Sequence, residues 1–241
     1  MNSNVTLKKD SWLSDGLGKP VYTVLLPPLG GASGLMEQLR SGSLYQVRVP
    51  ADRTRLLGEL LALGFSIINT NVELILEKLH ESDERKVGIR AAIPDDQKKV
   101  ADLAAKAFIN DRFHVDAEID NFLAEKIKAK WANNYFSGNR GSKMMIAELN
   151  ATLIGFLLLI EKQKKVKAID LVAVNDDYKR QGVAGEMIRE TVHSHLKKGD
   201  RLMVTTQLRN TSSLRLYEKL GFRHSGASYM LHLHTKRLTK I

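Results

Sequence analysis

The stretch from Ile169 to Gly185 constrains the fold of this chain more than any other feature. It reads IDLVAVNDDYKRQGVAG, an apolar strand pattern that enters a basic turn and opens at Gly182 into an amphipathic helix. Glycine at the turn lets the backbone approach a ligand closely. The free amides and the dipole of the first helical turn favour an anion there. Because Lys179 and Arg180 add full positive charges, the segment predicts a strand–turn–helix unit that binds a phosphate or pyrophosphate.

Strand and helix patterns alternate on both sides of this segment. Residues 86–241 predict the order β-α-α-β-β-β-α-β-α-β, with strands at 87–93, 144–149, 152–161, 167–174, 201–207 and 224–234 and helices at 95–108, 122–135, 183–198 and 211–220. The first 85 residues predict strands at 22–26 and 44–49, a helix at 51–63, and one long or two short strands along 65–79. The charged stretch 81–86 is the expected linker. We therefore expect a small α/β domain at 1–85 and a second domain at 86–241.

The charge of the chain is unevenly distributed. The 241 residues carry a formal net charge of +10, but residues 1–85 hold 9 Lys or Arg against 10 Asp or Glu, and the remainder holds 28 against 17. A basic excess favours phosphate-bearing ligands, nucleic acid or an anionic membrane surface, and does not choose among them.

Composition excludes several classes of protein. The chain has no Cys, which excludes a thiol nucleophile, a thiolate metal site and a disulfide framework. Its longest apolar run, residues 151–160, is about half of the ~20 residues that a membrane-spanning helix needs. No apolar segment follows Lys8 and Lys9, so we expect no export signal, no membrane insertion and a cytoplasmic protein.

Two motifs in the second domain resemble the GCN5-related N-acetyltransferase family. Lys179-Arg180-Gln181-Gly182-Val183-Ala184 resembles its acetyl-coenzyme A signature, Gln/Arg-x-x-Gly-x-Gly/Ala, with Lys179 departing from the usual first residue. The second motif, Asn210 followed by Tyr217-Glu-Lys-Leu-Gly-Phe222, lies at the interval typical of the family. The resemblance covers about residues 87–235. It implies an α/β fold with a mixed central sheet flanked by helices.

A narrower resemblance is to dTDP-fucosamine acetyltransferases, which acetylate a 4-amino-4,6-dideoxy sugar on a nucleotide diphosphate and also carry a small α/β domain before the transferase domain. The matching stretches are 49–52 running to 63–65, 111–116, 131–136 and Arg140-Gly141. The resemblance implies acetyl-CoA as co-substrate, a nucleotide-sugar acceptor, and direct attack by the sugar amine in a ternary complex. From the resemblance alone, a homodimer is one option for the assembly.

The resemblance assigns roles to the motif residues. Tyr217 is expected to be the general acid that protonates the departing thiolate, because a phenol holds its proton at neutral pH. Asn210 is expected to bind the pantetheine arm. The acetyl-CoA residues are expected to be Leu171, Val172, Ala173 and Val174 on the strand, Lys179 and Arg180 in the turn, and Gln181, Gly182, Val183, Ala184 and Gly185 through their amides.

Each role has a structural alternative. From the residues alone, Tyr217 is more simply a core aromatic, Asn210 is equally an N-cap for the helix at Thr211, and Lys179 with Arg180 is equally a solvated charged turn.

Acceptor binding is expected from residues before and within the second predicted helix of this domain. Arginine can grip a diphosphate with two hydrogen bonds and an aromatic ring can stack on a base or sugar, while the same residues are equally core and surface. The candidates are Arg112, His114, Asp116, Trp131, Tyr135 and Arg140, with Glu73, His114 and Asp116 left open as the general base.

No metal site is expected. His232 and His234 share one face of a strand, but the sequence brings no third ligand into view, and acetyl transfer needs no metal. Two other functions compete with the sugar-nucleotide acetyltransferase. One is acetylation of another amine, such as a protein N-terminus, a polyamine or an aminoglycoside. The other is a basic module that binds coenzyme A or nucleic acid without catalysis. The 6% aromatic content and the plain aliphatic strands argue against nucleic acid.

Overall fold

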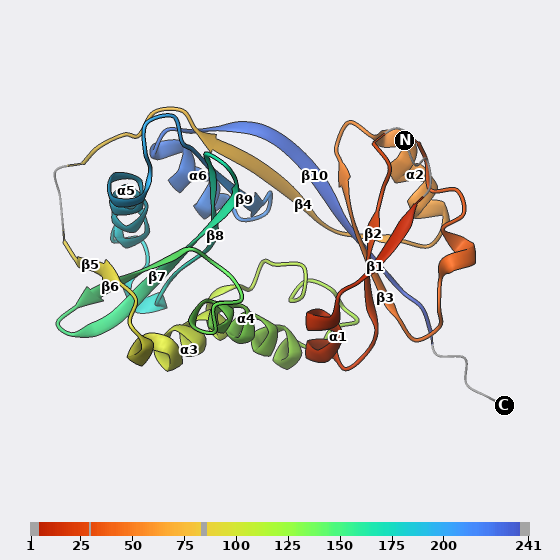
Figure 1. Cartoon of the computed structure of the whole chain (residues 1–241), viewed down its shortest axis with the longest axis horizontal. Helices are drawn as coiled ribbons and strands as arrows, with labels where there is room; N and C mark the ends of the chain where they lie inside the picture. Colours follow the sequence, from red (N-terminus) through yellow and green to blue (C-terminus); the bar gives the residue numbers. More distant parts are fainter. Residues whose placement is uncertain (1–4, 29, 83–85, 237–241) are drawn as a thin grey trace. The chain divides into compact units, whose positions relative to one another are not determined.

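The computed structural model describes residues 5–28, 30–82 and 86–236 and forms two compact units. The described part of the first unit lies within residues 1–71, 111–123 and 226–241, and that of the second within 72–110 and 124–225. Strands β4 (Ser66–Leu76) and β10 (Phe222–His234) each contribute residues to both units (Figure 1). The division into domains at 1–85 and 86–241 stays a prediction, and residues 83–85 of the expected linker lie outside the described residues.

A mixed sheet forms the centre of the second unit. Its strands follow the order β4-β9-β8-β7-β6-β5, in which β5 to β8 pair antiparallel and β8 pairs parallel with β9. The bounds are β5 (Gly88–Ala91), β6 (Lys143–Leu149), β7 (Thr152–Gln163), β8 (Val166–Val174) and β9 (Arg201–Gln207). The parallel pair is what a strand–helix–strand crossover through the basic turn produces.

Helices cover both faces of this sheet. α3 (Gln97–Ala107) and α4 (Asn121–Phe136) pack on one face, where Val100 and Ala132 join a core that includes Met144. α5 (Val183–His195) and α6 (Thr211–Lys219) pack on the other, where Met187 meets Met145. Neighbouring residues of β6 thus enter different cores, as the alternation of side chains along a strand requires. The predicted mixed α/β fold is confirmed.

The first unit is a smaller α/β arrangement. Its strands follow the order β1-β2-β3-β10, with β2 parallel to β3 and the other pairs antiparallel. α2 packs on one face through Leu56 and Leu60, in a core that also holds Leu231 of β10. The bounds are β1 (Thr6–Lys9), α1 (Ser11–Leu17), β2 (Val21–Leu25), β3 (Leu44–Pro50) and α2 (Thr54–Ala62).

The sequence prediction needs three corrections. β1 and α1 were not expected, although Asp10 caps α1 by accepting a hydrogen bond from the Leu13 amide. The predicted start of α2 at residues 50–52 was early, because the helix begins at Thr54. α5 ends at His195 rather than near 198. Of the two alternatives for residues 65–79, one long strand is confirmed as β4.

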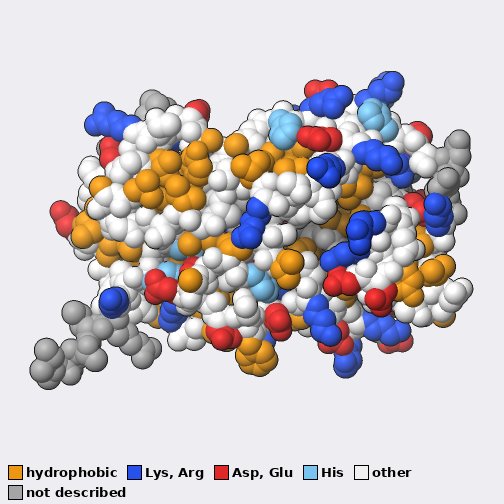
Figure 2. All heavy atoms as spheres, turned by 180° about the vertical axis from the view of Figure 1, so that it is seen from behind, with side chains coloured by type: hydrophobic (Ala, Val, Ile, Leu, Met, Phe, Trp, Pro, Cys, Tyr) orange, Lys and Arg blue, Asp and Glu red, His pale blue; other side chains and the backbone are white. Residues whose placement is uncertain are grey.

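Basic side chains gather over the second unit on the face shown in Figure 2, in line with the charge distribution of the sequence. None of the helices formed by the described residues has the length and apolar character to span a bilayer.

Candidate functional site

Strand β8 changes its pairing halfway along its length. It pairs with β9 from Val166 to Ile169, and the ladder of paired residues ends at Ile169–Val204. On its other edge β8 pairs with β7 beyond this point, but Leu158 lies opposite Leu171 and Leu159 opposite Ile169, so Asp170 is an extra residue that forms a β-bulge. The end of β8 therefore has backbone groups on its β9 side that are not used in the sheet.

The four strand residues predicted for acetyl-CoA, Leu171, Val172, Ala173 and Val174, form that unpaired edge. Leu171 and Ala173 are buried in the core under α3 and α4, while Val172 and Val174 pack on the opposite core. Their side chains are thus committed to the fold. Only backbone amides and carbonyls remain to bind an extended polar ligand such as pantetheine.

The basic turn leads from β8 to an open helix end. Gly182 is the N-cap of α5 with φ +91°, a left-handed conformation that glycine adopts without strain, and no side chain of the described residues caps the helix. Glu186 N donates the first intrahelical bond to Gly182 O, so the amides of Val183, Ala184 and Gly185 belong to the unsatisfied first turn. This arrangement favours an anion.

The side chains of the turn are partly engaged with one another. Lys179 Nζ lies 2.5 Å from Asp176 Oδ1 on an exposed surface, and Gln181 donates to the carbonyl of Asp177. Arg180 has φ +63°, which is unusual for a residue with a side chain. The left-handed backbone at Arg180 and Gly182 brings the turn around to the start of α5.

The second motif places Asn210 and Tyr217 on α6. Asn210 is the N-cap, and its Oδ1 accepts from the Ser213 amide at 3.3 Å, so its capping role is confirmed. Tyr217 is 3% exposed and packs against Phe222 with ring centroids 5.4 Å apart. Burial raises the pKa of Tyr217 above its usual range, so the phenol keeps its proton at neutral pH. Burial and a retained proton are properties that a core tyrosine and a general acid share.

Three of the predicted acceptor residues lie in the second unit. Arg140 and Trp131 both donate to Asp170 at the β8 bulge: Arg140 Nε to Oδ2 at 2.6 Å and Trp131 Nε1 to Oδ2 at 2.9 Å. Tyr135 packs edge-on against Phe136 beside the core under α3 and α4. Sequence reasoning did not single out Asp170, although it immediately precedes the predicted cofactor residues 171–174 in the same strand.

The other three lie in the segment 111–123 of the first unit. His114 Nδ1 lies 2.8 Å from Asp111 Oδ2, and both side chains are nearly buried. The Arg112 guanidinium lies 4.5 Å from the ring centroid of Phe113. Asp116, only 4% exposed, meets two side chains that sequence reasoning had set aside, His232 and His234.

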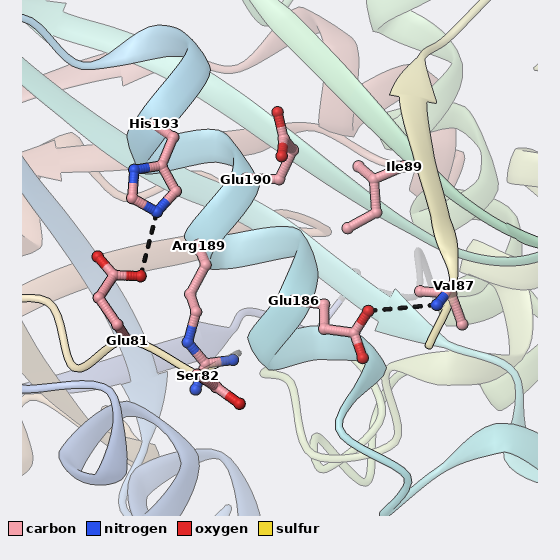
Figure 3. A pocket seen from close by; sticks show the side chains of 8 residues that line it. All are labelled: Glu81, Ser82, Val87, Ile89, Glu186, Arg189, Glu190 and His193. Atoms are coloured by element: carbon pink, nitrogen blue, oxygen red, sulfur yellow. Dashed lines mark hydrogen bonds and ion pairs between the residues drawn. The ribbon is translucent and has the colours of Figure 1, made fainter. Parts of the chain in front are cut away.

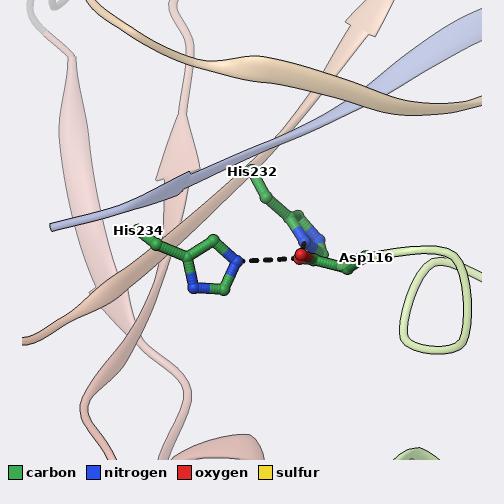
Figure 4. A group of neighbouring side chains, drawn as sticks. All are labelled: Asp116, His232 and His234. Carbon is green, nitrogen blue, oxygen red and sulfur yellow. Dashed lines mark hydrogen bonds and ion pairs between the residues drawn. The ribbon is translucent and has the colours of Figure 1, made fainter. Parts of the chain in front are cut away.

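Asp116, His232 and His234 form a buried hydrogen-bonded network (Figure 4). Asp116 Oδ2 lies 2.6 Å from His232 Nδ1 and 2.8 Å from His234 Nε2. Burial opposes ionisation of Asp116, but hydrogen bonds from the two imidazoles outweigh it and hold its pKa well below the usual range. Burial lowers the pKa of His232 and favours its neutral form. Asp116 is therefore a weak proton acceptor near neutral pH.

The same three residues are a candidate metal-binding group, since one ligand atom from each lies within 4.8 Å of the others. The surroundings suit hydrogen bonding better. A metal on His234 Nε2 would leave the proton on Nδ1, which lies 3.0 Å from the donor Lys19 Nζ. A metal-bound histidine normally donates its other ring N–H to an acceptor. His232 binds Asp116 through Nδ1, and its other nitrogen, Nε2, has no hydrogen-bond partner among the described residues. The absence of a metal from the mechanism stays a prediction.

A small pocket lies along α5 in the second unit (Figure 3). Its charged groups are largely engaged: Glu186 Oε2 accepts from the Val87 amide at 3.3 Å, and His193 Nε2 lies 3.2 Å from Glu81 Oε2. None of the predicted site residues lines it. The lining residues are Glu81, Ser82, Val87, Ile89, Glu186, Arg189, Glu190 and His193.

The chain is similar in sequence to two proteins of known name. The chain is 25% identical over 198 residues to a dTDP-fucosamine acetyltransferase of Escherichia coli O6:H1, covering 81% of this chain and 84% of that protein. It is 26% identical over 141 residues to the spore coat polysaccharide biosynthesis protein SpsD of Bacillus subtilis, covering 58% of this chain and about half, 48%, of SpsD.

Solved structures share the fold. A GCN5-related N-acetyltransferase from Sphaerobacter thermophilus aligns over 98% of this chain and 78% of its own, with a TM-score of 0.63 and 12% identity. A protein of unknown function from Staphylococcus epidermidis aligns over 98% and 92%, with a TM-score of 0.64 and 15% identity.

The family model described as "Acetyltransferase (GNAT) family" matches residues 100–222, which span about half of the chain. That range contains the β8 bulge, the basic turn, the open end of α5 and the Asn210–Phe222 motif. The resemblance drawn from the two sequence motifs is confirmed: the chain belongs to the acetyltransferase (GNAT) family of acetyl-CoA-dependent acyltransferases.

Proposed function

We propose that this protein transfers the acetyl group of acetyl-CoA to the amine of a nucleotide-linked amino sugar, a dTDP-4-amino-4,6-dideoxy sugar. The observation that carries the donor half is the junction of β8 and α5, where unpaired strand groups lead directly to an uncapped helix end. The acceptor half is supported by two relatives, one named as a dTDP-fucosamine acetyltransferase and one as a spore coat polysaccharide biosynthesis protein.

The junction matches the two chemical parts of the donor. Pantetheine carries amides in a row, which pair with strand backbone as another strand would, and residues 171–174 offer such an edge. The pyrophosphate carries negative charge, which the first-turn amides of α5 and the side chains of Lys179 and Arg180 attract. The basic excess of residues 86–241 adds longer-range attraction for donor and acceptor, since both carry phosphates.

Acetyl transfer then proceeds by direct attack. The sugar amine, after losing a proton, forms a C–N bond to the thioester carbonyl carbon, and the C–S bond breaks. The departing thiolate takes the proton of Tyr217, whose burial keeps the phenol protonated until that moment. The nitrogen then loses its second proton, which returns the Tyr217 phenolate to its neutral form, so the products are the amide and the coenzyme A thiol.

A base must accept the proton of the attacking ammonium group. Glu73 is the candidate we favour, because it alternates on β4 with the buried core residues Val72 and Leu74 and therefore projects from the opposite face of the sheet. Asp116 is disfavoured by its lowered pKa. His114 remains a second candidate.

A panel of amines tests the proposal. The full chain is incubated with acetyl-CoA and, in separate reactions, dTDP-4-amino-4,6-dideoxygalactose, its C4 epimer, a peptide with a free N-terminus, spermidine and kanamycin. Release of the coenzyme A thiol is measured, and products are identified by mass spectrometry. We expect turnover with a dTDP-amino sugar and little with the other amines. Turnover with the peptide, the polyamine or the aminoglycoside alone would overturn the acceptor assignment. Salt-dependent binding to DNA with no acetyl transfer would overturn the function as a whole.

A further inference from the structure

We propose that Asp170 is a positioning residue for acetyl-CoA: its carboxylate, clamped by Arg140 and Trp131, fixes the bulge that frees the end of β8. The inference rests on the proposed use of acetyl-CoA as the donor and is independent of the acceptor.

Asp170 lies at the point where β8 leaves β9. It is the extra residue between the pairs Leu158–Leu171 and Leu159–Ile169, and the parallel ladder with β9 ends at the residue before it. A bulge bends its strand and increases the local twist. The conformation of this one residue therefore decides how far residues 171–174 diverge from β9.

The carboxylate of Asp170 is held on both oxygens. Arg140 donates from Nε to Oδ2 at 2.6 Å and from Nη2 to Oδ1 at 2.5 Å, and Trp131 Nε1 donates to Oδ2 at 2.9 Å. The Asp170 side chain is 8% exposed. The Arg140 guanidinium also lies 4.7 Å from the centroid of the Trp131 ring. Two planar donors that contact each other leave the carboxylate little freedom to rotate.

The turn that carries Arg140 is itself anchored at the bulge. Ser142 donates from both its amide and its hydroxyl to the carbonyl of Leu159, at 2.8 and 3.1 Å. Gly141 lies so close to Leu158 that a Cβ placed there would be 2.4 Å from Leu158 Cδ1. Leu158 and Leu159 are the β7 residues that flank the bulge. Arg140 is thus fixed relative to both strands that meet at Asp170.

This geometry gives Arg140 and Trp131 a role other than the sugar contact predicted from sequence. The two Arg140 nitrogens that would grip a diphosphate are already bonded to Asp170. Both side chains act through Asp170 on the strand that binds acetyl-CoA. Substitution of Arg140 or Trp131 should therefore weaken the binding of acetyl-CoA more than the binding of the acceptor.

A second buried ion pair on β8 provides the control for this test. Lys167, near the other end of β8, forms an ion pair with Asp200, whose side chain is 7% exposed, close to the 8% of Asp170. That pair lies where β8 and β9 are fully paired. Asp200→Asn removes a comparably buried carboxylate without touching the bulge.

The test is calorimetric titration of the full chain with coenzyme A, together with thermal unfolding. We expect Asp170→Asn to raise the Kd for coenzyme A about tenfold, as the loss of a charge-assisted hydrogen bond implies. Asp200→Asn should lower the unfolding temperature by a similar amount and leave the Kd within about twofold of the wild type. Unchanged coenzyme A binding by Asp170→Asn, or equal weakening by Asp200→Asn, would overturn the proposal.

Arg140→Lys gives a milder version of the same test, because it keeps the charge and loses the two-pronged contact. We expect its Kd to rise about threefold, and we expect the double variant with Asp170→Asn to bind no more weakly than Asp170→Asn alone. Additive effects would contradict the clamp. If the wild type itself fails to bind coenzyme A, the proposed function fails. If the wild type binds coenzyme A, and Asp170→Asn, Arg140→Lys and the double variant all bind it equally well, only the proposed role of Asp170 fails.

Discussion

The second unit leaves polar backbone groups open at the end of β8 and the start of α5, whereas the first unit turns its buried polar side chains toward one another around Asp116. The open groups lie in a family-defining stretch, and the closed network lies on β10 and the segment 111–123. Open backbone groups on a strand edge and a helix end can hold a ligand, whereas the Asp116 carboxylate has both oxygens hydrogen-bonded inside the fold and contributes to stability. Changes in the second unit should therefore alter binding and rate, and changes in the network should alter folding.

Tyr217→Phe should give the largest effect. Removing the phenolic proton should lower turnover by about 100-fold, the low end of what general acid catalysis contributes, and change the Kd for coenzyme A by less than about twofold. Steady-state kinetics and calorimetric titration measure the two quantities. Tyr229→Phe, in the first unit, is the control and should be silent. If the Tyr217→Phe variant has the turnover of the wild type, Tyr217 is a core aromatic and not the general acid.

Asp116→Asn should act on stability. Both imidazoles contact Oδ2, so an asparagine that keeps its oxygen there turns its amide toward the backbone amide of Glu118, which donates to Oδ1 at 3.0 Å. Because two donors then face each other and the carboxylate charge is lost, we expect the free energy of unfolding in urea to fall by about 2–3 kcal/mol. Asp120→Asn, an exposed position that only caps the Phe122 amide, should change it by less than about 0.5 kcal/mol. Coenzyme A binding by the folded Asp116→Asn protein should be unchanged. Weakened coenzyme A binding would contradict the assignment of stability to the Asp116 network and of ligand binding to the second unit.

Gly182→Ala should weaken coenzyme A binding, and we expect a smaller effect than those of the two preceding substitutions. Alanine at φ +91° is strained by about 1–2 kcal/mol, and relief of that strain moves the amides of the turn, so the Kd should rise several-fold. Gly58→Ala is the matched control, since Gly58 lies inside α2 with open space around it and should tolerate or even gain from the change. Equal binding by both variants would show that the turn amides do not hold the ligand.

The network should also produce a modest pH dependence of stability. Burial lowers the pKa of His232, so below the ordinary histidine value of about 6.5 the unfolded chain binds a proton that the folded chain resists. Stability is then full above about pH 6.5 and declines as the pH falls toward 5. Urea unfolding at about pH 7.5 and about pH 5.5 should show this decline, and His232→Asn should reduce it. His195 has a lowered pKa as well and leaves a residual slope. An identical slope in His232→Asn would contradict the assignment.

The sequence predicted most of the second unit because its signals are local. The strands predicted at 144–149 and 152–161 form a hairpin with positive φ at Asn150 and Ala151, and Gly182 has the left-handed backbone that the motif requires. Asp95 and Asp96 lie at the start of α3, in the short 3-10 helix Pro94–Asp96 that leads into it. Asp96 also accepts two hydrogen bonds from Arg90, at 2.7 and 2.9 Å, and the sequence pattern did not predict this ion pair.

The groups that sequence reasoning missed are all joined across long stretches of chain. Asp116 meets His232 over 116 positions, and Asp170 meets Trp131 over 39. Asp170 looked like one polar residue in an apolar strand, which is the only signal that could have marked the bulge. Which atoms converge there depends on the packing of α4 against β8, and a pattern of residue types does not encode that directly.

Hydrogen–deuterium exchange with and without saturating coenzyme A tests the central claim most directly. We predict added protection in residues 170–174, at the amides on the β9 side that the sheet leaves unpaired, and in the first turn of α5, where no side chain of the described residues caps the helix. We predict no change in residues 166–169, which are already paired with β9. Unchanged exchange across 170–185 on coenzyme A binding would contradict the account.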